Sequence, residues 1–238
     1  MIKAVTFDLW NTLVEDKSYV DERVECLADA LSRVGVSKGR SELREAYHAS
    51  YNYARKVWEN ENHRHVTNEE RLNYILERLS TRLTEDLRLK VLKDFEEVAL
   101  LDPPPLAEGV RETLKSLRGD YRMGVICDVG ITPGRILRRV LEDYGILKFF
   151  DTTVFSDENG YCKPHRKIFE KALTDLDVKP PEAIHIGDLL QTDIAGAKAI
   201  GMRAVWLNKE GRPNTEPYRP NYEVRMLPEI LDILHGTV

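Results

Sequence analysis

The chain begins with Ile2-Lys3-Ala4-Val5-Thr6-Phe7-Asp8, and this stretch indicates the fold. The apolar run is rich in β-forming residues, is too short for a helix and ends abruptly at a carboxylate. It predicts a buried strand with Asp8 at its carboxyl end. In an open parallel sheet, ligands bind at the carboxyl ends of the strands, so Asp8 is the first candidate for chemistry.

The pattern after this strand is helical from Tyr19 to about Leu101. Apolar residues recur every three or four positions, as on one face of a helix. Four such segments follow one another, with apolar residues at Val20, Val24, Leu27 and Leu31, at Leu43, Ala46, Tyr47, Ala54 and Trp58, at Leu72, Ile75, Leu76 and Leu79, and at Leu87, Val91, Phe95 and Val98. Thr67, with Glu70 three residues later, predicts a capping box at the start of the third helix, and Thr84 is expected to start the fourth.

The prolines of Asp102-Pro103-Pro104-Pro105 end the helical region. Short strands and amphipathic helices then alternate, with strands expected at Arg122–Cys127, Thr152–Phe155, Ala183–Ile186 and Ala204–Leu207, and helices at Val110–Leu117, Arg135–Tyr144, Lys167–Leu176 and Ile194–Ile200. This alternation predicts a doubly wound, Rossmann-like α/β fold, in which helices cover both faces of a parallel sheet. Residues 211–221 are expected to form a surface loop before a last helix around residues 227–234.

Length and composition limit the class of protein. The 238 residues leave room for one core with one insertion, and we expect a core of residues 1–14 and 102–238 with an all-helical cap at residues 15–101. Hydrophobic residues make up 42% and charged residues 32%, which excludes a disordered or fibrous chain. The formal net charge is −5 and no long basic run exists, so no nucleic-acid partner is expected. No stretch resembles a membrane span or a signal peptide, so no membrane association is expected.

The cysteines indicate the compartment. Cys26, Cys127 and Cys162 are odd in number and lack the CxxC spacing of a redox or zinc site. We therefore expect no disulfide framework and a location in the reducing cytoplasm. The sequence gives no indication of the oligomeric state.

Polar residues follow the predicted strands at three further places, namely Cys127-Asp128, Lys163 and Gly187-Asp188. Each has an ordinary structural explanation when taken singly: a strand-terminal Asp often caps a helix, and Lys-Pro and Gly-Asp often form turns. Their order and spacing are together much more specific.

In this order the motifs resemble those of the haloacid dehalogenase-like hydrolase superfamily, in a member with a helical cap inserted after the first motif. The resemblance covers essentially the whole chain. The family's Asp-x-Asp-x-Thr motif is matched by Asp8-Leu9-Trp10-Asn11-Thr12 and its fourth motif by Gly187-Asp188-Leu189-Leu190-Gln191-Thr192-Asp193. The second motif, a strand ending in Ser or Thr, aligns with Val125-Ile126-Cys127-Asp128, and the third is Lys163-Pro164.

The resemblance implies a Mg²⁺-dependent phosphohydrolase that acts on a small phosphorylated molecule through an aspartyl-phosphate intermediate. Asp8 would be the nucleophile, and Lys163 would neutralise Asp8 and the transferring group. The implied Mg²⁺ ligands are Asp8, the Trp10 carbonyl, Asp188 and Asp193. Thr12 would be the third catalytic residue and would hydrogen-bond the phosphoryl oxygens. The residues expected to contact the substrate are Trp10, Asn11, Cys127 and Asp128.

Two residues depart from the family pattern. Trp10 stands where family phosphatases carry a second aspartate, the general acid that protonates the leaving group and then activates water. An indole cannot exchange a proton in this way, so we expect weak activity on unactivated alkyl phosphates. Cys127 replaces the hydroxyl of the second motif with a thiol, a weak hydrogen-bond donor, and packing is its expected role.

Trp10 keeps three alternative functions open. The family's 2-haloacid dehalogenases carry an aromatic residue at this position, but they need no metal and usually replace the Gly-Asp of the fourth motif, which Gly187-Asp188 retains. The phosphonate-cleaving relatives also lack the acid and use a cap lysine, for which Lys56 is a conceivable counterpart. The third alternative is a degenerate member that binds a phosphorylated ligand without turnover.

The cap is expected to select the substrate. Arg55, Trp58, His63 and His65 lie on or near the end of the second predicted helix and are candidates for contact with substrate, although Trp58 continues an apolar stripe and is expected to pack in the cap. We expect the cap to open and close about Val14–Asp16 and Leu101–Pro105, because substrate must enter and bulk water must be excluded.

Overall fold

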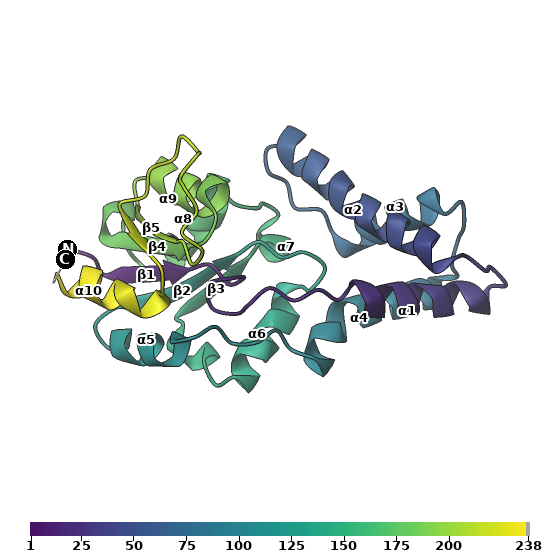
Figure 1. Ribbon diagram of the computed structural model, residues 1–238, viewed down its shortest axis with the longest axis horizontal. Helices are drawn as coiled ribbons and strands as arrows, with labels where there is room; N and C mark the ends of the chain where they lie inside the picture. Colours follow the sequence, from purple (N-terminus) through teal and green to yellow (C-terminus); the bar gives the residue numbers. More distant parts are fainter. Residues whose placement is uncertain (237–238) are drawn as a thin grey trace.

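The computed structural model describes residues 1–236, and its centre is a parallel sheet (Figure 1). The six strands of these residues lie in the order β3-β2-β1-β4-β5-β6, with every neighbouring pair parallel. Their bounds are β1 Ala4–Phe7, β2 Arg122–Cys127, β3 Thr152–Phe155, β4 Ala183–Gly187, β5 Arg203–Leu207 and β6 Tyr222–Val224. The predicted doubly wound α/β fold is confirmed, and the strand that ends at Asp8 lies in the middle of the sheet.

The central strand β1 is paired with a parallel strand on each edge and is buried on both faces. Phe7 pairs with Val125 of β2 and with Ile186 of β4, and all four residues of β1 are buried. Successive side chains of a strand point to opposite faces, so β1 contributes Val5 and Phe7 to one hydrophobic cluster and Ala4 to another. A run that is apolar on both faces is typical of a parallel strand covered by helices on both sides.

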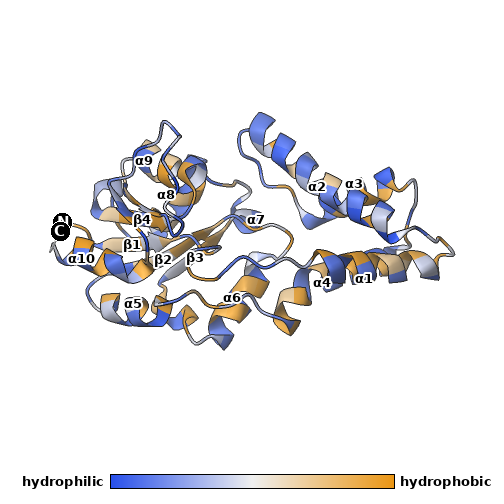
Figure 2. Ribbon diagram, in the orientation of Figure 1, coloured by the Kyte–Doolittle hydropathy of each residue, from blue (hydrophilic) through white to orange (hydrophobic). Residues whose placement is uncertain are grey.

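Helices cover both faces of the sheet (Figures 1 and 2). Helices α5 (Val110–Leu117), α6 (Gly134–Asp143) and α10 (Ile230–His235) pack against the face of Val5 and Phe7. Helices α8 (Arg166–Asp175) and α9 (Ala195–Ala199) pack against the opposite face. The short helix α7 (Ser156–Asn159) follows β3.

Several elements of the core differ from the prediction, among them β6, α9 and α10. Strand β6 was not predicted, because three residues at the edge of a sheet carry too little pattern. The helix expected at Ile194–Ile200 begins one residue later, after a π-helical turn at Leu190–Ile194 that contains part of the fourth motif. The last helix, α10, is preceded by a 3₁₀ turn at Leu227–Glu229.

The four helices expected in the cap are present between β1 and α5. They are α1 (Val20–Arg33), α2 (Arg40–Asn60), α3 (Asn68–Arg78) and α4 (Glu85–Leu101). Their apolar stripes share one buried cluster, which includes Leu27, Leu43, Tyr47, Ile75 and Phe95. The capping box is confirmed, because Thr67 Oγ1 accepts from the Glu70 amide at 3.2 Å and the Glu70 carboxylate accepts from the Thr67 amide at 2.8 Å. Thr84 precedes α4 as expected, but its side chain makes no capping hydrogen bond.

The two connections between core and cap lie side by side. The Glu15 amide donates to the Pro105 carbonyl at 2.8 Å, and the Ala107 amide donates to the Leu13 carbonyl at 3.0 Å. The cap extends from the carboxyl ends of the strands, and α4 lies against α6 of the core (Figure 1). The cap is therefore joined to the core at the edge of the sheet where Asp8 lies.

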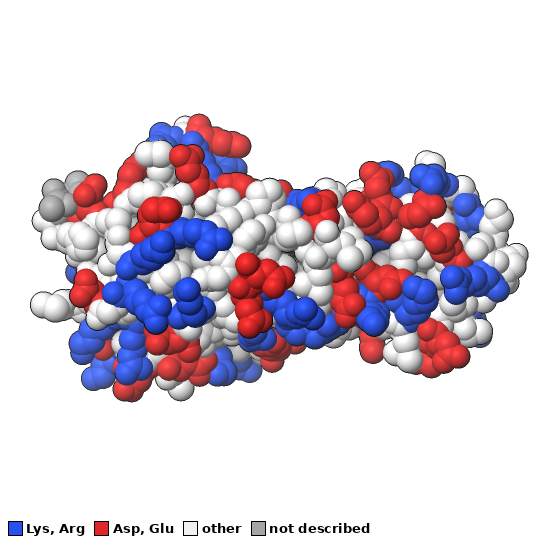
Figure 3. Space-filling model, turned by 90° about the horizontal axis from the view of Figure 1, so that it is seen from below, with Lys and Arg blue, Asp and Glu red and all other residues white. Residues whose placement is uncertain are grey.

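The surface carries both signs of charge. Basic and acidic side chains form neighbouring groups along the face shown in Figure 3, over the core and the cap alike. Within residues 1–236, no helix has the length and apolarity needed to cross a membrane.

Candidate active site

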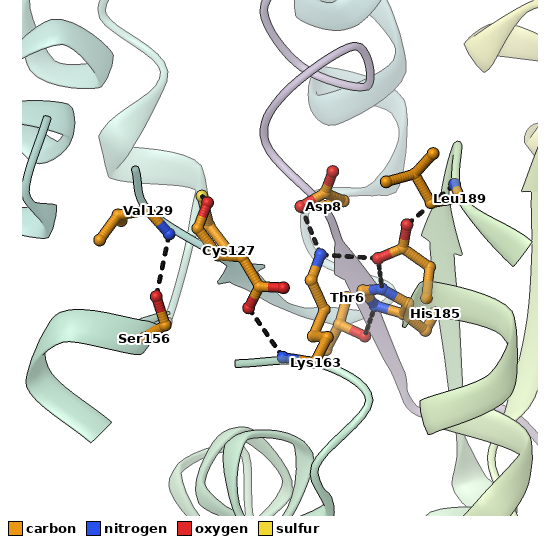
Figure 4. Close-up of polar contacts among 10 residues, drawn as sticks. Thr6, Asp8, Cys127, Val129, Ser156, Lys163, His185 and Leu189 are labelled. Carbon is orange, nitrogen blue, oxygen red and sulfur yellow. Dashed lines mark hydrogen bonds and ion pairs between the residues drawn. The ribbon is translucent and has the colours of Figure 1, made fainter. Parts of the chain in front are cut away.

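Asp8, Lys163 and Asp193 meet at the carboxyl ends of β1 and β4 (Figure 4). Lys163 Nζ lies 2.5 Å from Asp8 Oδ1 and 2.6 Å from Asp193 Oδ1. Asp188 follows β4 directly, and one oxygen each of Asp8, Asp188 and Asp193 lie within 4.8 Å of one another. Asp8 and Asp188 directly follow the neighbouring parallel strands β1 and β4, and Lys163 reaches them from the loop after α7, so residues of the first, third and fourth motifs meet here.

The site holds more negative than positive charge. Asp8, Asp188, Asp193 and Lys163 are all buried. Burial raises the pKa of Asp8 more than the Lys163 charge lowers it, and burial with the Asp193 charge raises the pKa of Asp188 to about 6. For Asp193 the effect of burial is outweighed by Lys163 and His185, which hold its pKa below the usual range. For Lys163 the effect of burial is outweighed by the surrounding carboxylates, chiefly Asp193, which hold its pKa above the usual range.

This donor set fits a hard divalent cation. Carboxylate and carbonyl oxygens are the ligands that Mg²⁺ prefers, and Mg²⁺ is usually bound by one or two carboxylates together with substrate phosphate. Clustered carboxylates with one lysine leave charge that such an ion neutralises. The residues whose oxygens meet here and could hold it are Asp8, Asp188 and Asp193.

A buried chain of hydrogen bonds behind the site was not predicted. Thr6 Oγ1 lies 2.9 Å from His185 Nδ1, and His185 Nε2 lies 3.1 Å from Asp193 Oδ1 (Figure 4). The Leu189 amide donates to the other Asp193 oxygen at 3.0 Å. Asp193 therefore accepts from His185, Leu189 and Lys163, and its carboxylate is held in one orientation. The available signal was a polar residue inside each of two apolar strands, since buried polar groups need hydrogen-bond partners.

Gly187 of the fourth motif has a steric role. A Cβ atom at this position would lie 2.2 Å from Asp193 Cγ. Any larger residue would displace the carboxylate that contacts Lys163, so a glycine is required beside Asp188.

The loop of the first motif is closed by its own backbone. The Leu13 and Val14 amides donate to the Leu9 carbonyl at 2.8 and 3.0 Å. Asn11 adopts a positive φ of 54°, and its side-chain oxygen accepts from the Asp16 amide at 3.1 Å, so this side chain holds the first connection to the cap. Thr12 Oγ1 is buried and has no hydrogen-bond partner among residues 1–236. Trp10 is partly buried against the core.

Cys127 and Asp128 at the end of β2 differ in role. Cys127 is fully buried in the hydrophobic core, and burial raises the pKa of its thiol. Asp128 Oδ1 accepts from the Lys163 amide at 2.8 Å and so fixes the backbone that carries the lysine. Burial raises the pKa of Asp128 to about 6.

The cap contacts the loop that carries Lys163. Trp58 Nε1 donates to the Lys163 carbonyl at 2.9 Å, the Cys162 amide donates to the His63 carbonyl at 2.8 Å, and the His65 amide donates to the Gly160 carbonyl at 3.0 Å. The prediction that Trp58 packs inside the cap is wrong, because its indole lies partly exposed between cap and core.

The other cap candidates lie in different surroundings. His65 is buried, with Nδ1 3.1 Å from Ser156 Oγ, whereas Arg55 is exposed and lies 3.9 Å from Glu59. Lys56 is exposed, and its carbonyl accepts from the Asn60 side chain at 2.7 Å.

Comparison with known proteins agrees with this geometry. Residues 2–201 match a family model described as haloacid dehalogenase-like hydrolase. A glyceraldehyde 3-phosphate phosphatase from Pyrococcus furiosus is 41% identical over 133 residues, which is about half the length of each protein, 53% of this chain and 53% of that one. A HAD phosphatase from Thermococcus onnurineus has a similar structure, with a TM-score of 0.66 and 28% identity over 99% of both chains. A 2-haloacid dehalogenase from Pseudomonas syringae gives a TM-score of 0.75 and 26% identity over the full length of both chains.

Proposed function

Because the chain belongs to the haloacid dehalogenase-like hydrolase family, we propose that it is a Mg²⁺-dependent phosphatase of a small phosphorylated molecule. The observation that carries this proposal is the group of three buried carboxylates, Asp8, Asp188 and Asp193, around the single lysine Lys163. Phosphatases among the similar proteins support it. We further propose a core of residues 1–14 and 102–238 with a cap of residues 15–101. We also propose a cytoplasmic location, because Cys26, Cys127 and Cys162 are all free.

Asp8 is the proposed nucleophile. One of its carboxylate oxygens forms a bond to phosphorus while the bond from phosphorus to the leaving oxygen breaks, which leaves an acyl phosphate on Asp8. Water then attacks the phosphorus, releases inorganic phosphate and restores the carboxylate. Lys163, held by Asp193 and by the Asp128 contact to its amide, neutralises charge on Asp8 and on the phosphoryl oxygens.

The proposed metal ligands are Asp8, the Trp10 carbonyl, Asp188 and Asp193. A bound Mg²⁺ would neutralise phosphoryl oxygens and align them with the nucleophile. Asp193 already accepts from Lys163, His185 and Leu189, so we assign it chiefly to holding the lysine. Thr12, Asn11, Trp10, Cys127 and Asp128 stay proposed neighbours of the substrate, with the contacts described above for each.

Trp10 determines which leaving groups the proposed phosphatase can release. No carboxylic acid stands in the first-motif position that protonates the leaving group, so the leaving oxygen must depart unprotonated or take a proton from water or the cap. General acid and base assistance is worth roughly 10²–10⁴-fold, so rates should rise steeply as the pKa of the leaving group falls. Aryl and acyl phosphates should react faster than sugar phosphates.

A 2-haloacid dehalogenase is the second candidate, favoured by Trp10 and by the similarity to the Pseudomonas syringae enzyme. The retained Asp188 beside Asp8 opposes it, since halide displacement needs no metal. The two candidates therefore differ in their dependence on Mg²⁺.

The test is a panel of p-nitrophenyl phosphate, phosphorylated metabolites, 2-haloacids and phosphonates, each with and without Mg²⁺, using Asp8→Asn as the inactive control. We expect Mg²⁺-dependent release of phosphate that the variant lacks. Metal-independent release of halide would establish the dehalogenase. Cleavage of phosphonates alone would establish the phosphonate hydrolase, and binding of phosphate esters without turnover a non-catalytic member.

A further inference from the structure

The cap buries two arginines without a counter-charge. Arg23 in α1 and Arg71 in α3 are 4% and 7% exposed, and they are the buried arginines of residues 1–236. Neither forms an ion pair within this part of the chain; their hydrogen-bond partners are carbonyl and hydroxyl oxygens. A buried guanidinium normally pairs with a carboxylate, because loss of its hydration is unfavourable.

Arg71 is the less satisfied of the two. Within residues 1–236 its guanidinium donates one hydrogen bond, a 3.4 Å contact to the Ser50 carbonyl, and lies 5.2 Å from the centre of the Tyr51 ring. Its Nε is buried and has no partner among the described residues. A guanidinium carries five N–H donors in a planar fork that matches a carboxylate or phosphate, so most of this binding capacity is unused.

Arg23 connects this position to the core. Its Nε donates to the Phe95 carbonyl at 2.9 Å, and its terminal nitrogens donate to the Tyr47 hydroxyl at 3.2 Å and to Thr132 Oγ1 at 2.9 Å. The Tyr47 and Tyr51 hydroxyls lie 3.1 Å apart, so they join Arg23 to the ring that Arg71 covers.

Both arginines lie next to the loops that position Lys163. Thr132, which binds Arg23, belongs to the loop that follows Asp128, and the Asp128 side chain holds the Lys163 amide. After the larger effect of burial, the Arg71 charge opposes the raised pKa of Cys162, the residue before Lys163, and helps to lower the pKa of His65. Arg23 thus contacts the core at the junction that Trp58 also bridges to Lys163, and the Tyr47 and Tyr51 rings join Arg71 to it.

We propose that Arg71, supported by Arg23, Tyr47 and Tyr51, binds a second anionic group on the leaving-group side of the substrate. The inference rests on the proposed phosphatase function and names its substrate class: a phosphate ester whose leaving group carries a carboxylate or a second phosphate. Either group offers paired acceptor oxygens to the fork of Arg71 and supplies the counter-charge that the cap lacks.

The experiment compares substrates that differ in one group. Glyceraldehyde 3-phosphate and 3-phosphoglycerate share a carbon skeleton and differ in an aldehyde against a carboxylate. The pair 3-hydroxypropyl phosphate and propane-1,3-diyl bisphosphate differ in a hydroxyl against a second phosphate. For the anionic member of at least one pair, we expect kcat/KM to be higher by roughly tenfold or more, the usual worth of a charged hydrogen bond. Preference in the first pair identifies the carboxylate, and preference in the second alone identifies the second phosphate.

Variants then locate the effect. Arg71→Met should bring the ratio of kcat/KM within the preferred pair to about one, and Arg71→Lys should retain part of the preference. Arg82→Met, which removes an exposed arginine of the same cap, should keep the wild-type ratio. Wild-type protein without preference in either pair, or Arg71→Met with the full preference, would overturn the proposal.

A binding measurement separates this inference from the proposed function. Calorimetric titration of Asp8→Asn with the same four compounds in the presence of Mg²⁺ requires no turnover. Tighter binding of the anionic member supports the arginine site even if no ester is hydrolysed, a result that would reject the phosphatase alone. Equal affinity within both pairs, or no binding at all, would reject the arginine site.

Discussion

Lys163 in the core and Arg71 in the cap are both buried cations, but their surroundings differ. Lys163 Nζ lies within 2.6 Å of two carboxylates, whereas Arg71 has no carboxylate partner among residues 1–236 and donates one hydrogen bond of 3.4 Å. The core site therefore has more carboxylates than cations, whereas Arg71 in the cap is a buried cation without a carboxylate partner in this part of the chain. We infer that the core supplies the chemistry, for which every group must be held in place, while the cap leaves binding capacity free for part of the substrate.

The largest expected effect is a difference in the free energy of unfolding between variants that lack one or the other of these two cations. Lys163→Met leaves Asp8 and Asp193 buried together without a positive charge, and we expect a loss of about 3–5 kcal/mol in the free energy of unfolding. Arg71→Met removes an uncompensated charge, so we expect a loss below about 1 kcal/mol or a gain. Urea unfolding at pH 7 without Mg²⁺ measures both values. Equal losses would show that the two cations are equally well paired.

The pKa of His65 makes the stability of the protein depend on pH and on the charge of Arg71. Burial and then the Arg71 charge lower the pKa of His65 to about 4, against opposing attraction from Glu70. An unfolded histidine ionises near pH 6.5, so the unfolded state binds more protons between about pH 6.5 and 4. The contribution of His65 to stability is thus complete at neutral pH and falls as the pH is lowered through this window, by up to about 3 kcal/mol.

Comparison of variants isolates this effect from the titration of other groups. His65→Gln should reduce the slope of unfolding free energy against pH between pH 6.5 and 4, and Arg71→Met should reduce it partly, because the repulsion from the guanidinium is lost. Unfolding curves at a series of pH values give the slopes. A wild-type slope in both variants would show that neither His65 nor Arg71 contributes to this pH dependence.

Asp188→Asn tests the negative charge of the core. One anionic ligand is lost, so we expect Mg²⁺ affinity to fall by roughly tenfold or more, which corresponds to about 1.4 kcal/mol. Calorimetry with MgCl₂ measures the change, and Asp157→Asn, outside the carboxylate group, is the control. Wild-type affinity in Asp188→Asn would place the metal elsewhere.

Trp58→Phe tests the link between the two regions and carries the smallest expected effect. It removes the 2.9 Å hydrogen bond to the Lys163 carbonyl, worth about 0.5–1.5 kcal/mol. We propose that the cap opens by breaking such contacts while Val14–Asp16 and Leu101–Pro105 act as hinges. Hydrogen exchange of the Cys162 amide, which donates to the His63 carbonyl, should become faster in Trp58→Phe and stay unchanged in Arg55→Met. Unchanged exchange in Trp58→Phe would contradict this link.

The core and its motifs were predictable because the signal is local. Asp8 and Asp188 each follow an apolar run, and parallel strands bring their carboxyl ends to one edge, so these two residues follow from order and spacing. Lys163 lies in the loop after α7 and was found from its place in the order of the motifs. Thr6 and His185 were not predictable as a pair, because their contact depends on the register between β1 and β4. The carboxylate orientation of Asp193 depends on the same register.

The sequence predicts the four helices of the cap, but not which of their polar residues are buried or which residues contact the core. The apolar stripes give the four helices and their shared cluster, yet Arg23 and Arg71 look like ordinary polar positions between stripe residues. Arg23 is buried where α1, α2 and α4 meet the loop after β2, and Arg71 of α3 is buried against α2. Trp58 shows the same limit, because a residue on an apolar stripe can lie against the core instead of inside the cap.

The most direct test of the proposed acyl phosphate on Asp8 is the early time course of p-nitrophenol release from p-nitrophenyl phosphate with Mg²⁺. Asp8 should form the acyl phosphate quickly with this good leaving group, whereas its hydrolysis should be slow, because Trp10 stands where an acidic residue would activate water. We predict a burst of p-nitrophenol that matches the enzyme concentration, followed by slower steady release, and neither phase in Asp8→Asn. Steady turnover without a burst, or a burst that persists in Asp8→Asn, would contradict a covalent intermediate on Asp8 that accumulates for want of a general base.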